Sequence, residues 1–222
     1  MLKHFVIQDY IKTITAISLN EQRPLVKHAE IAAQFGISTA AVSDMVKKLV
    51  REKLVINHSH KGIELTASGL ALGKKMIRRH RLWESFLHDV LKLPWHKVHH
   101  EAEHLEHAGS DELIDHLDEF LKFPSSDPHG NPIPDKDGRI VVDSAECPLS
   151  EAKIAAEVEL LRFIAFDPEY LDFMSRLGLK IGTKLRVREK LDFDNSIRCE
   201  LDGKDVVLTQ LSAQQIYVRP VP

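Results

Sequence analysis

The chain contains 222 residues, of which 43% are hydrophobic, and its formal net charge is −3. This composition is typical of a folded protein with one large domain or two to three small ones. No apolar run approaches the length that spans a membrane, the first residues lack the apolar segment of a signal peptide, and Cys147 and Cys199 form neither a disulfide framework nor a paired zinc motif. We therefore expect a cytoplasmic protein.

The charge is unevenly distributed along the chain. Residues 1–81 hold 14 Lys and Arg against 6 Asp and Glu, whereas the remainder holds 16 against 27. A basic first third on an acidic body indicates a polyanionic partner for that third. Charge alone leaves open the alternative that the asymmetry has no functional consequence.

The first third has the pattern of a helix-turn-helix. Apolar residues at helical spacing predict a helix over residues 5–17 and a short helix over 28–35. Gly36 then forms a turn before a helix capped by a Ser/Thr pair, and this order is typical of a helix-turn-helix. Small and polar side chains on the exposed face of the last helix can enter a major groove. These side chains are Ser38, Thr39, Ala40, Ser43, Asp44 and Lys47.

A hairpin follows directly and completes a winged helix. Residues 54–58 and 63–66 read as strands around a turn at Gly62. We expect Lys47, Lys48 and Lys61 to neutralise DNA phosphates. The alternative is a winged helix that is used only for protein contacts.

The central third combines imidazoles with carboxylates. A long helix is predicted from residue 66 to 91, and another begins at Pro94-Trp95. If the second helix is continuous, one stripe of it carries His99, Glu103, Glu106 and His107. The first helix carries a similar pair, His80 and Glu84, also four residues apart. Oxygen and imidazole ligands of this kind suit a divalent cation. The plainer interpretation is a solvated, charged helix face.

The remaining elements are a helix, a loop and a small β-domain. A helix over 110–121 has an apolar face that predicts a dimer interface, and the Pro/Gly-rich loop over 123–134 is either a simple connection or brings Asp127 and His129 to a metal. Residues 135–148 read as a linker and 150–166 as a helix. Short alternating strands from residue 182 to 222 predict an SH3-like β-barrel. The sequence contains no Gly-rich phosphate loop, Ser/His/Asp set or HExxH motif, so an enzyme has little support.

This arrangement resembles the diphtheria-toxin-repressor family over nearly the whole chain. The resemblance implies a mainly α fold with small β parts: a winged helix-turn-helix DNA-binding domain (1–73), a helical metal-binding and dimerisation domain (74–140), a linker (141–150) and an SH3-like, FeoA-like domain (151–222). Members are cytoplasmic homodimers that bind pseudo-palindromic double-stranded operator DNA when loaded with a divalent metal and repress metal-uptake genes. The most specific residues are Arg79-His80-Arg81-Leu82, Glu106-His107 with Ser110-Asp111-Glu112, and Gly130-Asn131-Pro132-Ile133-Pro134.

The resemblance also implies two metal positions. One would be formed by Asp9, Glu103, Glu106 and His107, completed by Asp127. The other would use His80, Glu84, His99, His129 and Asp167. His100, His104 and His116 fall outside the motif, and we expect them to face solvent.

The choice of metal follows from two of these positions. Iron-responsive relatives carry Met where this chain has Asp9 and Cys where it has Glu103, and hard carboxylate oxygens favour manganese (Mn²⁺) over more thiophilic ions. We therefore predict a manganese-dependent repressor, with an iron (Fe²⁺)-dependent repressor as the alternative and a metal-dependent hydrolase as a distant one. Relatives without the C-terminal domain carry an acid where this chain has Lys12, so we expect two separate metal sites rather than a paired cluster.

Overall fold

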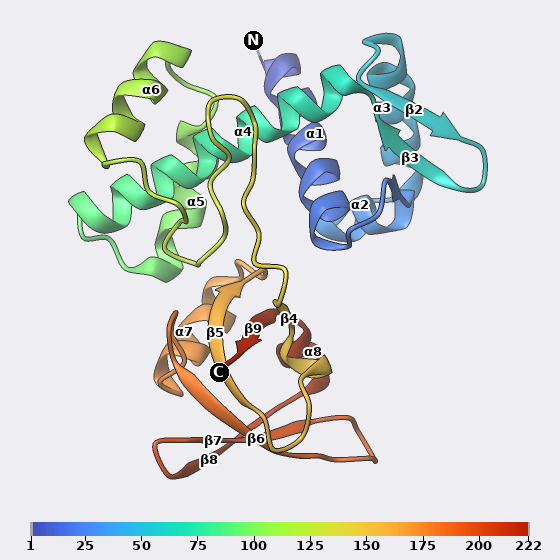
Figure 1. Cartoon of the computed structure of the whole chain (residues 1–222). Coiled ribbons are helices and arrows are strands. Elements are labelled where there is room, and N and C mark those ends of the chain that lie inside the picture. Colours follow the sequence, from blue (N-terminus) through green and yellow to red (C-terminus); the bar gives the residue numbers. More distant parts are fainter. Residues whose placement is uncertain (1, 222) are drawn as a thin grey trace. The chain divides into compact units, whose positions relative to one another are not determined.

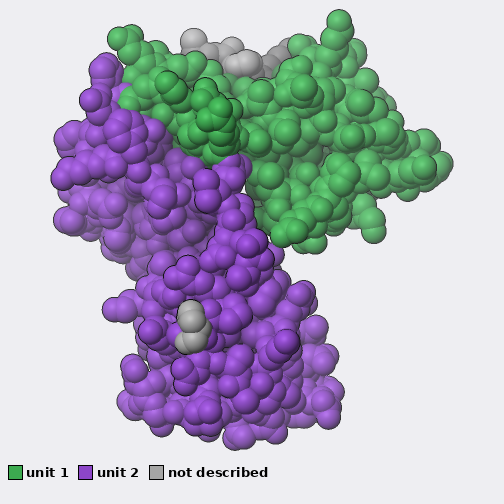
Figure 2. All heavy atoms as spheres, in the orientation of Figure 1, with its two compact units in different colours: residues 1–80, 105–115, 134–139 green, residues 81–104, 116–133, 140–222 purple. Residues whose placement is uncertain are grey.

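The fold was obtained as a computed structural model that describes residues 2–221, with side chains from residue 5 onward. Met1 and Pro222 lie outside the described part. Met1 is the first residue of the predicted DNA-binding domain and of the stretch inspected for a signal peptide, and Pro222 is the last residue of the predicted SH3-like domain. The chain divides into two compact units (Figure 2). The first comprises residues 1–80, 105–115 and 134–139, and the second comprises residues 81–104, 116–133 and 140–222.

The first unit contains the predicted winged helix (Figure 1). Its elements are α1 (Leu2–Asn20), β1 (Leu25–Val26), α2 (His28–Phe35), α3 (Thr39–Arg51), β2 (Val55–His58) and β3 (Gly62–Leu65). The strands pair in the order β1-β3-β2, so β1, which was not predicted, adds a strand to the hairpin. Gly36 adopts a φ of 63° between α2 and α3, and the Ser38 hydroxyl accepts a hydrogen bond from Ala41 N at 3.2 Å.

One apolar core joins the elements of the winged helix. Ile11 and Ile14 of α1, Ile31 of α2 and Val46 of α3 are fully buried, as is Ile63 of the wing. Each helix contributes apolar residues three or four positions apart, which is why the helical periodicity was visible in the sequence. Because α1 and α3 share this core, a group that fixes α1 also fixes α3.

The helices of the central third follow the predicted order. α4 (Ala67–Ser85) continues into one π-helical turn (Phe86–Val90), α5 (Trp95–Leu105) follows Pro94, and α6 (Asp111–Phe120) begins where Ser110 caps it. The predicted stripe on a single helix is wrong in its second half, because α5 ends at Leu105 and Glu106 and His107 lie in the following turn. None of the helices in the described part is long and apolar enough to cross a membrane.

The C-terminal part of the second unit is a six-stranded antiparallel sheet with strand order β4-β9-β5-β6-β7-β8. Its strands are β4 (Cys147–Pro148), β5 (Glu157–Phe163), β6 (Lys184–Lys190), β7 (Ile197–Leu201), β8 (Lys204–Leu208) and β9 (Ile216–Pro220). A 3₁₀ turn (Leu149–Glu151) and the helices α7 (Pro168–Arg176) and α8 (Gln210–Gln214) complete it.

The helix predicted over residues 150–166 is wrong. Val158 and Leu160 alternate towards the core of the sheet, and β5 pairs with both β6 and β9. Apolar residues four apart fit either a helix or a strand in a short segment, and here pairing with distant strands decided the outcome.

Candidate metal centres

The first group of ligand-type side chains joins α1 to the turn after α5. We call Asp9, Glu106 and His107 the α1 cluster, because each offers a ligand atom within 4.8 Å of the others. His107 Nε2 lies 2.8 Å from Asp9 Oδ1 and 3.6 Å from Glu106 Oε1. Glu106 is fully buried, and its charge must therefore be balanced within the protein.

Two further residues of α1 orient the His107 ring. Gln8 Oε1 lies 2.8 Å from His107 Nδ1, and the Phe5 ring stacks on the imidazole with a centroid distance of 4.7 Å. When the amide oxygen accepts from Nδ1–H, the lone pair of a neutral ring is left on Nε2, which faces Asp9. An imidazole lone pair and a carboxylate oxygen at this distance require a proton or a metal between them. The geometry therefore fits a divalent cation.

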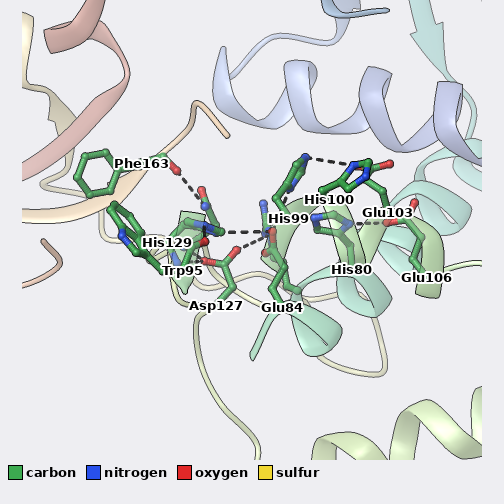
Figure 3. A network of polar contacts seen from close by, with 12 residues as sticks. His80, Glu84, Trp95, His99, His100, Glu103, Glu106, Asp127, His129 and Phe163 are labelled. Atoms are coloured by element: carbon green, nitrogen blue, oxygen red, sulfur yellow. Dashed lines mark hydrogen bonds and ion pairs between the residues drawn. The ribbon is translucent and has the colours of Figure 1, made fainter. Parts of the chain in front are cut away.

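Glu106 also contacts two basic side chains. Lys12 Nζ lies 2.7 and 2.8 Å from its two carboxylate oxygens, and His80 Nδ1 lies 2.5 Å from Oε2. The contact with His80 is drawn in Figure 3. Sequence reasoning placed His80 in the other metal position and took Lys12 only as a departure from relatives, because neither contact could be inferred from spacing.

The second group lies within the second unit and is completely enclosed. We call Glu84, Asp127 and His129 the buried cluster (Figure 3). His129 Nδ1 lies 3.6 Å from Glu84 Oε1, and both side chains have zero exposure. Asp127 Oδ2 lies 3.6 Å from Arg81 Nε. Among the described residues, neither Asp127 Oδ2 nor His129 Nδ1 has a hydrogen-bond partner, which is unusual for buried polar atoms.

The electrostatics of the buried cluster also fit a cation. Burial and the nearby charge of Glu84 raise the pKa of Asp127 to about 6. Burial alone would lower the pKa of His129, but the charges of Glu84 and Asp127 outweigh it and raise that pKa. His129 Nε2 lies 2.9 Å from the Trp95 carbonyl, which can only accept, so the lone pair of a neutral ring would be on Nδ1 and would face the carboxylates.

The β-domain holds the loop that carries two of these residues. Phe163 N donates to His129 O at 2.9 Å, and Asn131 Nδ2 donates back to Phe163 O at 3.0 Å. A Cβ atom at Gly130 would lie 1.9 Å from Leu161 O, so only glycine allows this close approach to β5. The C-terminal domain thereby fixes the position of Asp127 and His129 through hydrogen bonds to Phe163 and the close approach of Gly130 to β5, which the sequence did not reveal.

The structure distributes the remaining predicted ligands differently from the expected sets. Asp127 belongs to the buried cluster rather than with Glu106 and His107. His99 Nδ1 lies 3.0 Å from Glu84 Oε1, its Nε2 lies 3.5 Å from Glu103 Oε1, and its ring stacks on Phe166 at 4.4 Å. Asp167 caps α7 by accepting from Tyr170 N, and it is exposed. Its carboxylate is therefore engaged in the helix cap and belongs to neither cluster.

The predicted DNA-contacting residues occupy an accessible surface of the first unit. Exposed side chains include the N-cap Ser38, the α3 residues Thr39, Ala40, Asp44, Lys47 and Lys48, and Lys61 of the wing. Ser43 is half-buried, and its hydroxyl donates to Thr39 O. Arg51 and Asn57, which sequence reasoning missed, line the same hollow as Lys47 and Lys48. The three histidines expected to face solvent, His100, His104 and His116, are exposed.

Three family descriptions match consecutive parts of the chain. Residues 5–63 match the N-terminal DNA-binding domain of iron-dependent repressors, and residues 66–135 match their metal-binding and dimerisation domain. Residues 147–220 match the FeoA domain. Two of these descriptions are those of repressors, as the resemblance implied.

Similar proteins are described as transcriptional repressors. The diphtheria toxin repressor of Corynebacterium efficiens is 32% identical over 187 residues, which cover 80% of each chain. A manganese-dependent transcriptional repressor solved in complex with manganese is 34% identical, with a TM-score of 0.87 over 97% of this chain and 100% of that one. ScaR with bound Zn²⁺ is 35% identical, with a TM-score of 0.84 over 97% of this chain and 99% of that one. The chain therefore belongs to the diphtheria-toxin-repressor family of metal-dependent, DNA-binding transcriptional repressors.

Proposed function

We propose that this protein is a manganese-responsive repressor that acts in the cytoplasm as a homodimer on pseudo-palindromic operator DNA and controls metal-uptake genes. The observation that carries the proposal is the α1 cluster, in which Asp9 of the DNA-binding module lies 2.8 Å from His107 Nε2. In each of the two clusters the ligand-type atoms are carboxylate oxygens and imidazole nitrogens. Such hard ligands favour manganese over more thiophilic ions.

Iron is the second candidate. It is favoured by the family descriptions, which are those of iron-dependent repressors. In the first position, the resemblance places sulfur ligands in iron-responsive relatives where this chain carries Asp9 and Glu103. Glu106 and His107 can serve either metal. Asp9 is therefore the carboxylate of the α1 cluster that would discriminate, and Glu103, which lies beside His99 outside both clusters, is the second position at which the resemblance predicts a difference.

The metal would act through the packing of the first unit. Held by Asp9, Glu106 and His107, a divalent ion would supply a bond between α1 and the turn after α5. Because Ile11 and Ile14 of α1 lie in the same core as Val46 of α3, fixing α1 restricts the recognition helix. Two recognition helices at a spacing of about one DNA turn would then match two half-sites. A coupling of about 1–3 kcal/mol between metal and DNA is typical of such systems.

We assign the second metal position to the buried cluster. Glu84, Asp127 and His129 would provide two carboxylates and one imidazole in a dry site. Arg81 beside Asp127 compensates part of the negative charge. The C-terminal domain holds the loop through Gly130, so occupation of this position would also stabilise the attachment of that domain.

The test is metal-dependent DNA binding. Operator fragments selected from a random pool are titrated by fluorescence anisotropy with Mn²⁺ and, anaerobically, with Fe²⁺. Glu106→Ala should lose metal-activated DNA binding while the dimer persists, and Glu101→Ala, an exposed acid of α5 outside both clusters, should behave as wild type. Unchanged activation in Glu106→Ala would refute the α1 cluster as the sensor.

Metal choice is tested with a double variant. Asp9→Met combined with Glu103→Cys should move the response from Mn²⁺ towards Fe²⁺, because both substitutions replace hard oxygen by sulfur. The readout is the ratio of the metal concentrations that half-activate DNA binding. An unchanged ratio would place selectivity at other residues.

A further inference from the structure

Lys12 occupies an unusual place beside the α1 cluster. It lies one helical turn after Asp9 on α1, and its Nζ contacts both carboxylate oxygens of Glu106, at 2.7 and 2.8 Å. The Lys12 side chain is 12% exposed, whereas that of Glu106 is fully buried. The ammonium group therefore supplies a counter-charge to a carboxylate that would be costly to bury alone.

The same carboxylate is required as a metal ligand. A carboxylate has about four lone-pair sites, and Lys12 and His80 together use three contacts to the two oxygens of Glu106. Asp9 and Glu106 supply two negative charges, of which Lys12 already neutralises one. A divalent ion would neutralise both, so ion and ammonium compete for the same charge. Two cations in contact with one carboxylate would also repel each other in a poorly hydrated site.

We propose that Lys12 is a built-in competing cation, which a divalent metal must displace from Glu106 in order to bind the α1 cluster. The exchange breaks the Lys12–Glu106 ion pair and forms a metal–carboxylate bond. The long, partly exposed lysine side chain then carries its charge to solvent. Lys12 would thus set the metal concentration at which the sensor responds, and Glu106 would be held in place before the metal arrives. This inference rests on the proposed function of the α1 cluster.

The experiment measures Mn²⁺ binding directly, without DNA. Lys12→Met removes the competing charge with similar side-chain volume. Isothermal titration calorimetry should then show tighter binding at the α1 cluster by about tenfold, because the repulsion between the ammonium group and the incoming ion is lost. Lys75→Met is the matched control, because Lys75 pairs with exposed Asp111 at 2.6 Å and should leave Mn²⁺ affinity unchanged. Asp9→Asn in the wild-type and Lys12→Met backgrounds identifies which binding event belongs to this cluster.

A second readout separates competition from simple loss of structure. Without metal, Lys12→Met should lower the melting temperature, because buried Glu106 loses its counter-ion. Added Mn²⁺ should raise that temperature by more than it does in the wild type. If Lys12→Met does not fold, Lys12→Gln, which keeps a hydrogen-bond donor to Glu106, replaces it in both measurements.

The outcomes are distinguishable. Equal or weaker Mn²⁺ binding by the Lys12 variants, with a wild type that binds Mn²⁺ in an Asp9-dependent manner, would overturn the competition and leave the proposed function intact. A wild type that takes up no Mn²⁺ at this cluster would overturn both.

Discussion

The attachment of the loop that carries Asp127 and His129 to the β-domain can be tested by placing a single methyl group at Gly130. The added Cβ of Gly130→Ala would lie 1.9 Å from Leu161 O and 2.9 Å from Arg162 Cα. Both are backbone atoms, so no side-chain rotation relieves the overlap. The φ of +84° adds strain of about 1–2 kcal/mol for any residue with a Cβ.

The loop must therefore move away from β5. This movement breaks the hydrogen bonds between His129 O and Phe163 N and between Asn131 Nδ2 and Phe163 O, each worth about 1 kcal/mol net. Together with the backbone strain, we expect a loss of about 3–4 kcal/mol in the free energy of unfolding. Because the loop carries Asp127 and His129, metal affinity of the buried cluster should fall as well.

Urea unfolding of the metal-free chain measures the first effect, and fluorescence of Trp95, whose ring lies 5.6 Å from that of His129, reports on the loop. Gly203→Ala is the matched control, because Gly203 also has a positive φ of +76° but nothing within 4 Å of its added Cβ. The control should lose only the strain. If Gly130→Ala were no more destabilising than Gly203→Ala, the close contact with β5 would not fix the loop.

Three further predictions concern DNA binding and the support of the α1 cluster. Lys47→Ala should weaken binding to all DNA sequences alike and reduce the salt dependence of binding measured by anisotropy, whereas Ala40→Ser should change sequence preference. If Lys47→Ala changed only specificity, the assignment of α3 as the recognition helix would be wrong. Arg79→Ala should lower unfolding free energy by about 2–3 kcal/mol in urea, because Arg79 donates to the carbonyls of Glu106, Ala108 and Gly109, and a wild-type midpoint would contradict this role. Asp111 accepts from Lys75 and Arg79, which lower its pKa, so its stabilisation is present at neutral pH and is lost as pH falls below the ordinary value of 3.8. Because this carboxylate is largely exposed, Asp111→Asn should cost only about 0.5 kcal/mol at pH 7 and nothing at pH 2; an equal loss at both pH values would refute the assignment.

The elements whose apolar residues face one local core were predictable from sequence. The three helices and the hairpin of the winged helix, the capped start of α3 at Ser38 and the alternating strands after residue 182 all follow from periodicities that neighbouring residues impose. The residue types of the two candidate metal clusters were also predicted from sequence, because paired carboxylates and imidazoles are costly to bury without a cation.

The grouping of those residues depended on tertiary structure. Spacing on one helix assigned Glu103, Glu106 and His107 to a single stripe, but α5 ends at Leu105. In the turn that follows, Gly109 adopts a φ of +83° and Arg79 donates to the carbonyls of Glu106 and Ala108. Likewise, Asp127 lies with Glu84 because the loop that carries it is bound to β5.

The strand β5 is the clearest case of this division. Its residues are compatible with the helix predicted over 150–166, in which Ile154, Val158 and Leu161 would share one apolar face. In the structure Val158, Leu160 and Phe163 are buried, whereas Ile154 is exposed. Hydrogen bonds to β6 and β9 made it a strand, and the same strand binds the loop that carries Asp127 and His129 through Phe163. Local composition indicates that a segment belongs to a core, but long-range backbone pairing selects its conformation and therefore which of its side chains leave water, because both conformations satisfy the short-range preferences.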